Sequence, residues 1–135
     1  MISNIRLKAE HNHTGRFMNP PETYKINLAK LGTVTLFDIK GEMTAFSEPL
    51  INDAYKQAIG QDTRKILFNF NHDAYIDSAG IAIFIQVLAH AIKRNQLIGI
   101  TGLSKHFTKI FKMLGITKFA KIHANVQTAV DALNA

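Results

Sequence analysis

Ile66-Leu67-Phe68-Asn69-Phe70 forms a short apolar run, and a loop over 71–75 connects it to Ile76-Asp77-Ser78-Ala79-Gly80-Ile81. A run of five residues of this kind is typical of a central strand that is buried on both faces of a sheet. Apolar residues then recur at helical spacing as far as about Arg94. This stretch therefore predicts a buried β-strand, a short loop and a long helix that begins near Ser78.

The flanking segments extend this pattern to the order β-β-α-β-α-β-α-β-α. The first two strands are expected to pair as a hairpin around Gly32. Strands then alternate with helices, which favours an α/β fold with a mixed, mostly parallel sheet of four to five strands and about four flanking helices. We expect strands over 24–28, Val34–Ile39, Ile66–Phe70, Leu97–Thr101 and, as a short edge, Lys121–Ala124, and helices over Ser47–Ile59, from Ser78 to about Arg94, from the cap Ser104 to Gly115 and from the cap Asn125 through Leu133.

Length and composition indicate one ordinary globular domain. The chain has 135 residues, of which 47% are hydrophobic and 19% are charged. Residues 1–22 lack periodicity and end near Pro20-Pro21, so we expect a flexible N-terminal arm at 1–22 and a single domain over 23–135. The absence of cysteine excludes disulfides, thiolate metal sites and cysteine nucleophiles.

Neither a membrane span nor a signal peptide is expected. No apolar run approaches the roughly 18 residues that a span requires, and charged residues interrupt the N-terminal segment. We therefore expect a cytoplasmic protein without a membrane partner.

Charge is distributed unevenly along the chain. The net charge is +6, and no acidic residue occurs between Asp77 and Asp131. Such a field attracts acidic partners, although a solvated basic face explains it equally well. Nucleic acid is an unlikely partner, because the lysines that share one helix face have no interleaved aromatic residues. The basic residues of this half are Lys93, Arg94, Lys105, Lys109, Lys112, Lys118 and Lys121.

The stretch Asp77-Ser78-Ala79-Gly80 between a strand and a helix resembles the Asp-Ser-(Ser/Thr/Ala)-Gly signature of bacterial STAS-domain anti-sigma factor antagonists. The resemblance continues through Leu97–Gly102 and through Phe111–Ile116, which looks like the family's Leu-x-x-x-Gly-Leu segment. It covers roughly residues 24–134 and implies the STAS fold. One departure is Thr44, which follows Gly41-Glu42-Met43 where many members carry an aspartate.

The resemblance also implies a function. In the family, an anti-sigma factor serine kinase of the GHKL type phosphorylates the serine that follows the aspartate, using ATP, and a PP2C-type phosphatase removes the phosphate. The unphosphorylated antagonist binds the kinase and so releases a sigma factor. This role maps to Ser78. The alternative within the family is a regulatory module of a kinase and phosphatase pathway that controls a different target.

The expected partner-binding residues surround Ser78. Asp77 is expected to cap the helix or to orient the loop, although a serine at this position can itself be an N-cap. The spacing of Ile81, Phe84, Ile85, Leu88 and Ile92 predicts that these five residues face the core. Ile83 would then lie exposed on the opposite side, and Gly80 would allow another backbone to approach closely. The expected contact set is Asp77, Ser78, Ala79, Gly80 and Ile83.

Catalysis, cofactors and metals are not expected. The segment Ile76–Gly80 is not the Gly-x-Ser-x-Gly elbow of serine hydrolases, and His72 has no visible triad partner. His11 and His13 have no further metal ligands nearby. We therefore predict a binding module rather than an enzyme.

Overall fold

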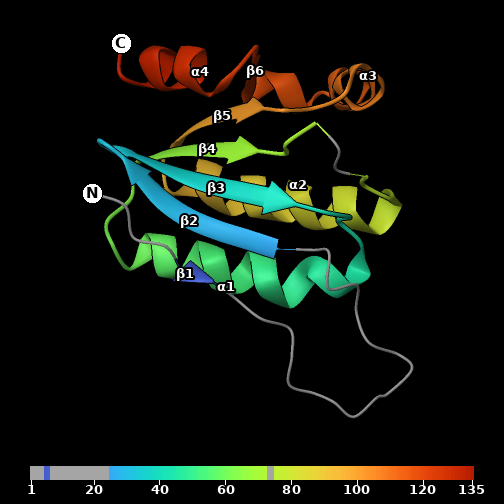
Figure 1. Ribbon diagram of the computed structural model, residues 1–135, viewed down its shortest axis with the longest axis horizontal. Helices are drawn as coiled ribbons and strands as arrows, with labels where there is room; N and C mark the ends of the chain where they lie inside the picture. The colour runs from blue at the N-terminus through green and yellow to red at the C-terminus, as the bar shows by residue number, and fades with distance from the viewer. Residues whose placement is uncertain (1–4, 7–24, 73–74) are drawn as a thin grey trace.

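The computed structural model describes residues 5–6, 25–72 and 75–135, and within them one six-stranded sheet in the order β1-β2-β3-β4-β5-β6. The first three strands pair antiparallel and the last four pair parallel, so the predicted mixed, mostly parallel sheet is confirmed (Figure 1). The strands are β1 (Ile5–Arg6), β2 (Lys25–Leu31), β3 (Val34–Lys40), β4 (Lys65–Asn69), β5 (Leu97–Thr101) and β6 (Lys121–His123).

Strand β1 is the one strand among the described residues that the sequence did not predict. Ile5 pairs with Leu28 and Arg6 with Asn27, so two residues of the predicted arm form an edge strand. The other residues of 1–22 lie outside the described residues, as does Tyr24 at the start of the first predicted strand.

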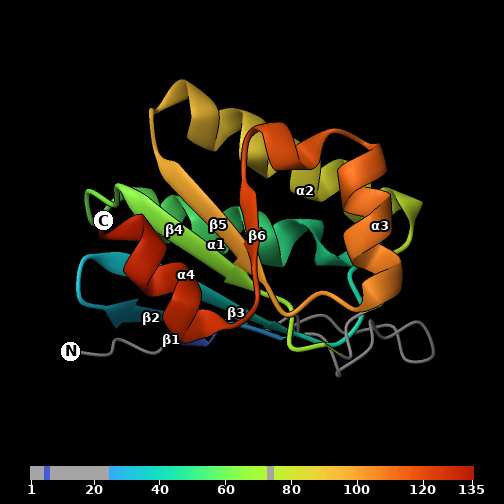
Figure 2. The same ribbon diagram turned by 90° about the horizontal axis from the view of Figure 1, so that it is seen from above.

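Within the described residues, four α-helices flank the sheet, as predicted. Figure 2 shows α4 on one face, with α1 and α2 on the other. Ser104 and Asn125 are confirmed as N-caps, because their side-chain oxygens accept hydrogen bonds from the backbone N–H groups of Phe107 at 3.1 Å and Thr128 at 2.8 Å. The helices are α1 (Glu48–Ile59), α2 (Ser78–Lys93), α3 (Lys105–Met113) and α4 (Val126–Leu133), with short 3₁₀ turns η2 (Ala45–Ser47) and η3 (Ile116–Lys118).

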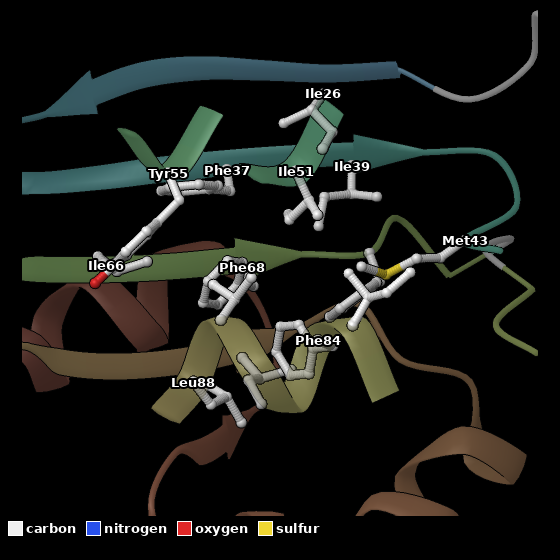
Figure 3. Packing of buried hydrophobic residues seen from close by; sticks show 14 of the residues in the cluster. Ile26, Phe37, Ile39, Met43, Ile51, Tyr55, Ile66, Phe68, Phe84 and Leu88 are labelled. Carbon is white, nitrogen blue, oxygen red and sulfur yellow. The ribbon is translucent and has the colours of Figure 1, made fainter. Parts of the chain in front are cut away.

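Strand β4 is the centre of the core, because it is covered on both faces. Ile66 and Phe68 belong to the larger cluster under α1 and α2, where Phe68 meets Phe84 edge-on with ring centroids 4.9 Å apart (Figure 3). Leu67 faces the opposite way and packs in a smaller cluster with Leu133 of α4. The alternation explains why all three middle residues of this strand are apolar.

The buried side of helix α2 is rotated from the one that the sequence predicted: Phe84 and Leu88 are buried as expected, but Ile92 is exposed. Ile83 belongs to the core and is only 7% exposed, whereas Ile85 is 41% exposed. The prediction was wrong because the helix is apolar almost all round, so two neighbouring stripes both satisfy helical spacing. The buried side carries Gly80, where the helix lies directly against the backbone of Met43. The buried residues are Gly80, Ile83, Phe84, Val87, Leu88 and Ala91.

Across the described residues, no helix combines the length and the apolar character that crossing a bilayer requires.

Candidate functional site

Met43, three residues after the end of β3, holds the segment 75–77 that precedes α2. The backbone N–H of Met43 donates to the carbonyl of Tyr75 at 2.7 Å, and the N–H of Asp77 donates to the carbonyl of Met43 at 3.2 Å. These bonds form an isolated parallel bridge between Met43 and Ile76. The start of α2 is therefore fixed to the end of the β3 segment.

Asp77, rather than Ser78, caps α2. The Oδ1 atom of Asp77 accepts a hydrogen bond from the backbone N–H of Gly80 at 2.8 Å. Ser78 is the first residue of the helix and is exposed, and no hydrogen bond of its hydroxyl is found among the described residues. The expectation that Asp77 caps the helix is confirmed, and Ser78 is an exposed residue at the helix start.

Gly80 lies inside the protein, against Met43. A Cβ atom at Gly80 would stand 2.1 Å from the carbonyl oxygen of Met43 and 2.7 Å from its carbonyl carbon. The close backbone approach expected at this glycine therefore occurs within the chain. Because Gly80 and Ile83 are both buried, neither offers the surface contact that the sequence predicted. Asp77, Ser78 and Ala79 keep their access to solvent.

The loop between β4 and α2 starts with two residues in left-handed backbone conformation, Asn71 at φ 59° and His72 at φ 60°. The Nδ2 group of Asn71 donates to Oδ1 of Asp38 at 2.8 Å and to the carbonyl of Ile39 at 2.9 Å. Sequence reasoning missed this anchor, although asparagine is among the residues that tolerate this conformation. His72 is exposed, and its backbone N–H donates to the carbonyl of Gly102 at 2.6 Å.

The family model of the STAS domain matches residues 25–129 of the chain. The chain belongs to the STAS domain family. The match spans every strand and helix from β2 through the first half of α4, together with the helix start at Ser78.

Relatives of this STAS domain include the anti-sigma-B factor antagonist of Staphylococcus aureus, which is 24% identical over 93 residues, or 69% of this chain and 84% of the relative. An anti-sigma factor antagonist from Mycobacterium paratuberculosis has a similar crystal structure, with a TM-score of 0.73 and 13% identity over 87% of this chain and 100% of that one. The structure of Bacillus SpoIIAA in its phosphorylated form is also similar, with a TM-score of 0.61 and 17% identity over 79% of this chain and 97% of that one. The resemblance and the fold expected from the sequence are confirmed.

Thr44 supports the loop beside the helix start of this STAS domain. Its Oγ1 atom accepts a hydrogen bond from the N–H of Phe46 at 3.2 Å, and its own N–H donates to Oγ of Ser47 at 2.9 Å. This reciprocal capping box begins the 3₁₀ turn η2. Where many family members carry an aspartate, threonine therefore provides a capping oxygen without a negative charge. Ser47 occupies the N-cap position of α1, but its side chain makes no cap hydrogen bond to that helix.

The exposed face of α2 continues from Ser78 along the STAS domain. Ala82, Ile85 and Ala89 follow Ser78 at i+4, i+7 and i+11, and all four residues are exposed. Tyr75 is exposed next to this face and meets Phe107 of α3 edge-on, with ring centroids 6.0 Å apart. No formally charged residue occurs in the helix before Lys93.

No group of three or more histidine or acidic side chains is arranged to hold a metal ion in the part of the chain that the structure describes. His11 and His13, the two histidines considered in the sequence, lie outside it.

Proposed function

We propose that this STAS domain is an anti-sigma factor antagonist that binds a serine-kinase anti-sigma factor and is switched off by phosphorylation of Ser78. The exposed position of the Ser78 hydroxyl at the start of a firmly held helix carries this proposal. The unphosphorylated form would bind the GHKL-type kinase and so release the sigma factor, and a PP2C-type phosphatase would restore it. The domain acts by binding, in the cytoplasm, and not as an enzyme. The relatives named as anti-sigma factor antagonists and the phosphorylated form of SpoIIAA support this proposal.

Phosphate at Ser78 is compatible with the folded domain. The free N–H groups and the positive dipole end of a helix favour an anion at its first residue. Because Ser78 is exposed, the added group enters solvent rather than the core. Phosphorylation therefore leaves the fold intact, and its effect falls on a docked partner.

The docking face consists of Asp77, Ser78, Ala79, Ala82 and Ile85. Ile85 takes the place of Ile83, because it is exposed on the same side of α2 as Ser78. A partner that covers this face must exclude water from a surface without formal charge between Ser78 and Ile85. A phosphate adds about 1.5 to 2 negative charges at one end of that surface, which opposes docking by both size and desolvation.

Incubation with the anti-sigma factor kinase and ATP is expected to place one phosphate on Ser78, as mapped by peptide mass spectrometry. Ser78→Ala should abolish the modification and keep kinase affinity, and it should not weaken the helix cap, because Asp77 provides that cap. Ser78→Asp should weaken kinase binding only in part, because one charge is less than that of a phosphate. Phosphate on Thr44 or Ser104 with Ser78 unmodified would contradict the proposal.

Association with the kinase is expected to slow as salt rises. The described part of the chain has no acid between Asp77 and Asp131, and Lys93, Arg94 and five further lysines produce a positive field that attracts an acidic partner. Screening shortens this field to about 8 Å at physiological ionic strength, so stopped-flow association rates should fall while dissociation rates change little. An association rate that is independent of salt would leave the basic half as a solvated surface only.

A further inference from the structure

The turn between α3 and η3 exposes three large apolar side chains within seven residues. Met113 is 83% exposed, Leu114 is 52% exposed and Phe119 is 59% exposed. Buried Ile116 and Ala120 attach the same turn to the core, so these three exposed side chains belong to an ordered structure. We call residues 112–121 the α3–η3 corner. It leads into β6, the edge strand opposite β1, and lies at that margin of the molecule (Figure 1).

Exposed lysines lie close in the sequence to these apolar side chains. Lys112, Lys118 and Lys121 belong to the corner, and Lys105 and Lys109 lie on α3 at i, i+4 with Lys112 at i+7. No acidic residue occurs anywhere from 78 to 130. Burial, with a smaller contribution from Lys121, lowers the pKa of His123, so the lysines rather than this imidazole provide the positive charge near neutral pH.

We propose that the α3–η3 corner is a contact site for the surface of a membrane rich in anionic phospholipids. Leucine and phenylalanine side chains enter the boundary between headgroups and acyl chains, and lysines beside them meet the anionic headgroups. Such contact needs no membrane span, so it is compatible with the helices described above, but it departs from the expectation that the protein has no membrane partner. It uses neither Ser78 nor Ile85, although it shares Lys112, Lys118 and Lys121 with the basic half that is expected to attract the kinase.

The cations of the corner favour a lipid surface over an acidic protein. Protein interfaces are enriched in aromatic residues, methionine and arginine, and they are depleted in lysine. The corner contains only lysine as a cation, and the last arginine of the chain is Arg94. Along α3, Met113 follows Phe107, the neighbour of Tyr75, by six residues, or about 9 Å of helix.

Co-sedimentation of the full chain with vesicles tests the proposal. The protein should bind vesicles made of equal parts phosphatidylglycerol and phosphatidylcholine, should not bind vesicles of phosphatidylcholine alone, and should be released by high salt. Leu114→Ser with Phe119→Ser should reduce partitioning about tenfold or more, since both side chains contribute apolar area. Lys112→Gln with Lys118→Gln should also reduce binding to the anionic vesicles, because two cations that meet the anionic headgroups are lost.

Leu97→Ser is the matched control, because Leu97 is equally exposed but lies at the start of β5, outside the corner. Leu97→Ser should bind the vesicles as strongly as the wild type does. All of the variants should have the melting temperature of the wild type, because the changed side chains are exposed. Ser78→Ala should also keep vesicle binding, which separates this proposal from the proposed function. Failure of the wild type to bind anionic vesicles, or unchanged binding of the Leu114 and Phe119 double variant, would overturn the proposal. Binding to polyglutamate but not to vesicles would assign the corner to an acidic protein instead.

Discussion

Ile83→Lys is expected to lower the melting temperature by about 10 °C or more, whereas Ile85→Lys should melt close to the wild type. Ile83 is 7% exposed within the main core, so an ammonium group at this position would be buried without a partner. Such a substitution costs about 3–5 kcal/mol out of the roughly 5–15 kcal/mol that stabilises a domain of this size. Thermal unfolding monitored by circular dichroism measures the difference.

Ile85→Lys should instead weaken binding of the anti-sigma factor kinase. Ile85 is 41% exposed and lies seven residues after Ser78, on the same face of α2. A lysine there would place a charge in a surface that the docked partner must desolvate. Isothermal titration with the kinase is the measurement. Equal melting of the two variants would show that the side of α2 is misassigned, and wild-type affinity of Ile85→Lys would remove this residue from the docking face.

The order of the elements was predictable because local patterns were strong. The five-residue run Ile66–Phe70 has the length and composition of a buried strand, and the structure places β4 at Lys65–Asn69 in the centre of the sheet. The N-caps Ser104 and Asn125 were predictable for a similar reason, since each acts on a backbone N–H three residues away. Short-range rules suffice when the partner is a near neighbour in the chain.

The side of α2 that is buried could not be predicted in this way. Ile81, Phe84, Ile85 and Leu88 satisfy helical spacing as well as Ile83, Phe84, Val87 and Leu88 do. Only the approach of distant segments selects the second set, and no periodicity within the helix contains that information. Strand β1 was missed for the same reason, because its pairing partner Leu28 lies 23 residues beyond Ile5.

For the site, the sequence located Ser78, but the structure was needed to assign the roles of its neighbours. A serine and an aspartate at a helix start are both good caps, and only the bond from the N–H of Gly80 to Asp77 distinguishes them. The departure at Thr44 likewise acquired a physical meaning only when its capping box was seen. The motif thus predicts where the site lies in the chain. Exposure and hydrogen bonds then show which residue caps the helix and which is accessible to a partner.

Gly80→Ala is expected to destabilise the domain by about 3 kcal/mol or more and to disturb the switch. An added Cβ would lie 2.1 Å from the carbonyl oxygen of Met43, and neither that backbone nor the helix can move away without breaking the bonds that join Met43 to Tyr75 and Asp77. The same displacement would shift Ser78, so kinase binding should fall as well. Urea unfolding and titration with the kinase measure the two effects.

Gly60→Ala provides the matched control for this substitution. Gly60 follows α1 with an ordinary φ of −62°, and the nearest atoms to an added Cβ are 3.6 Å away. Alanine there restricts the unfolded chain without a clash, so stability should stay unchanged or rise by about 0.4–1 kcal/mol. If Gly80→Ala unfolds at the same urea concentration as Gly60→Ala, Met43 does not press on the helix start. Gly80 would then have no role in holding Ser78 in place. The presence of a glycine at this position would instead have to be explained by a contact with the partner.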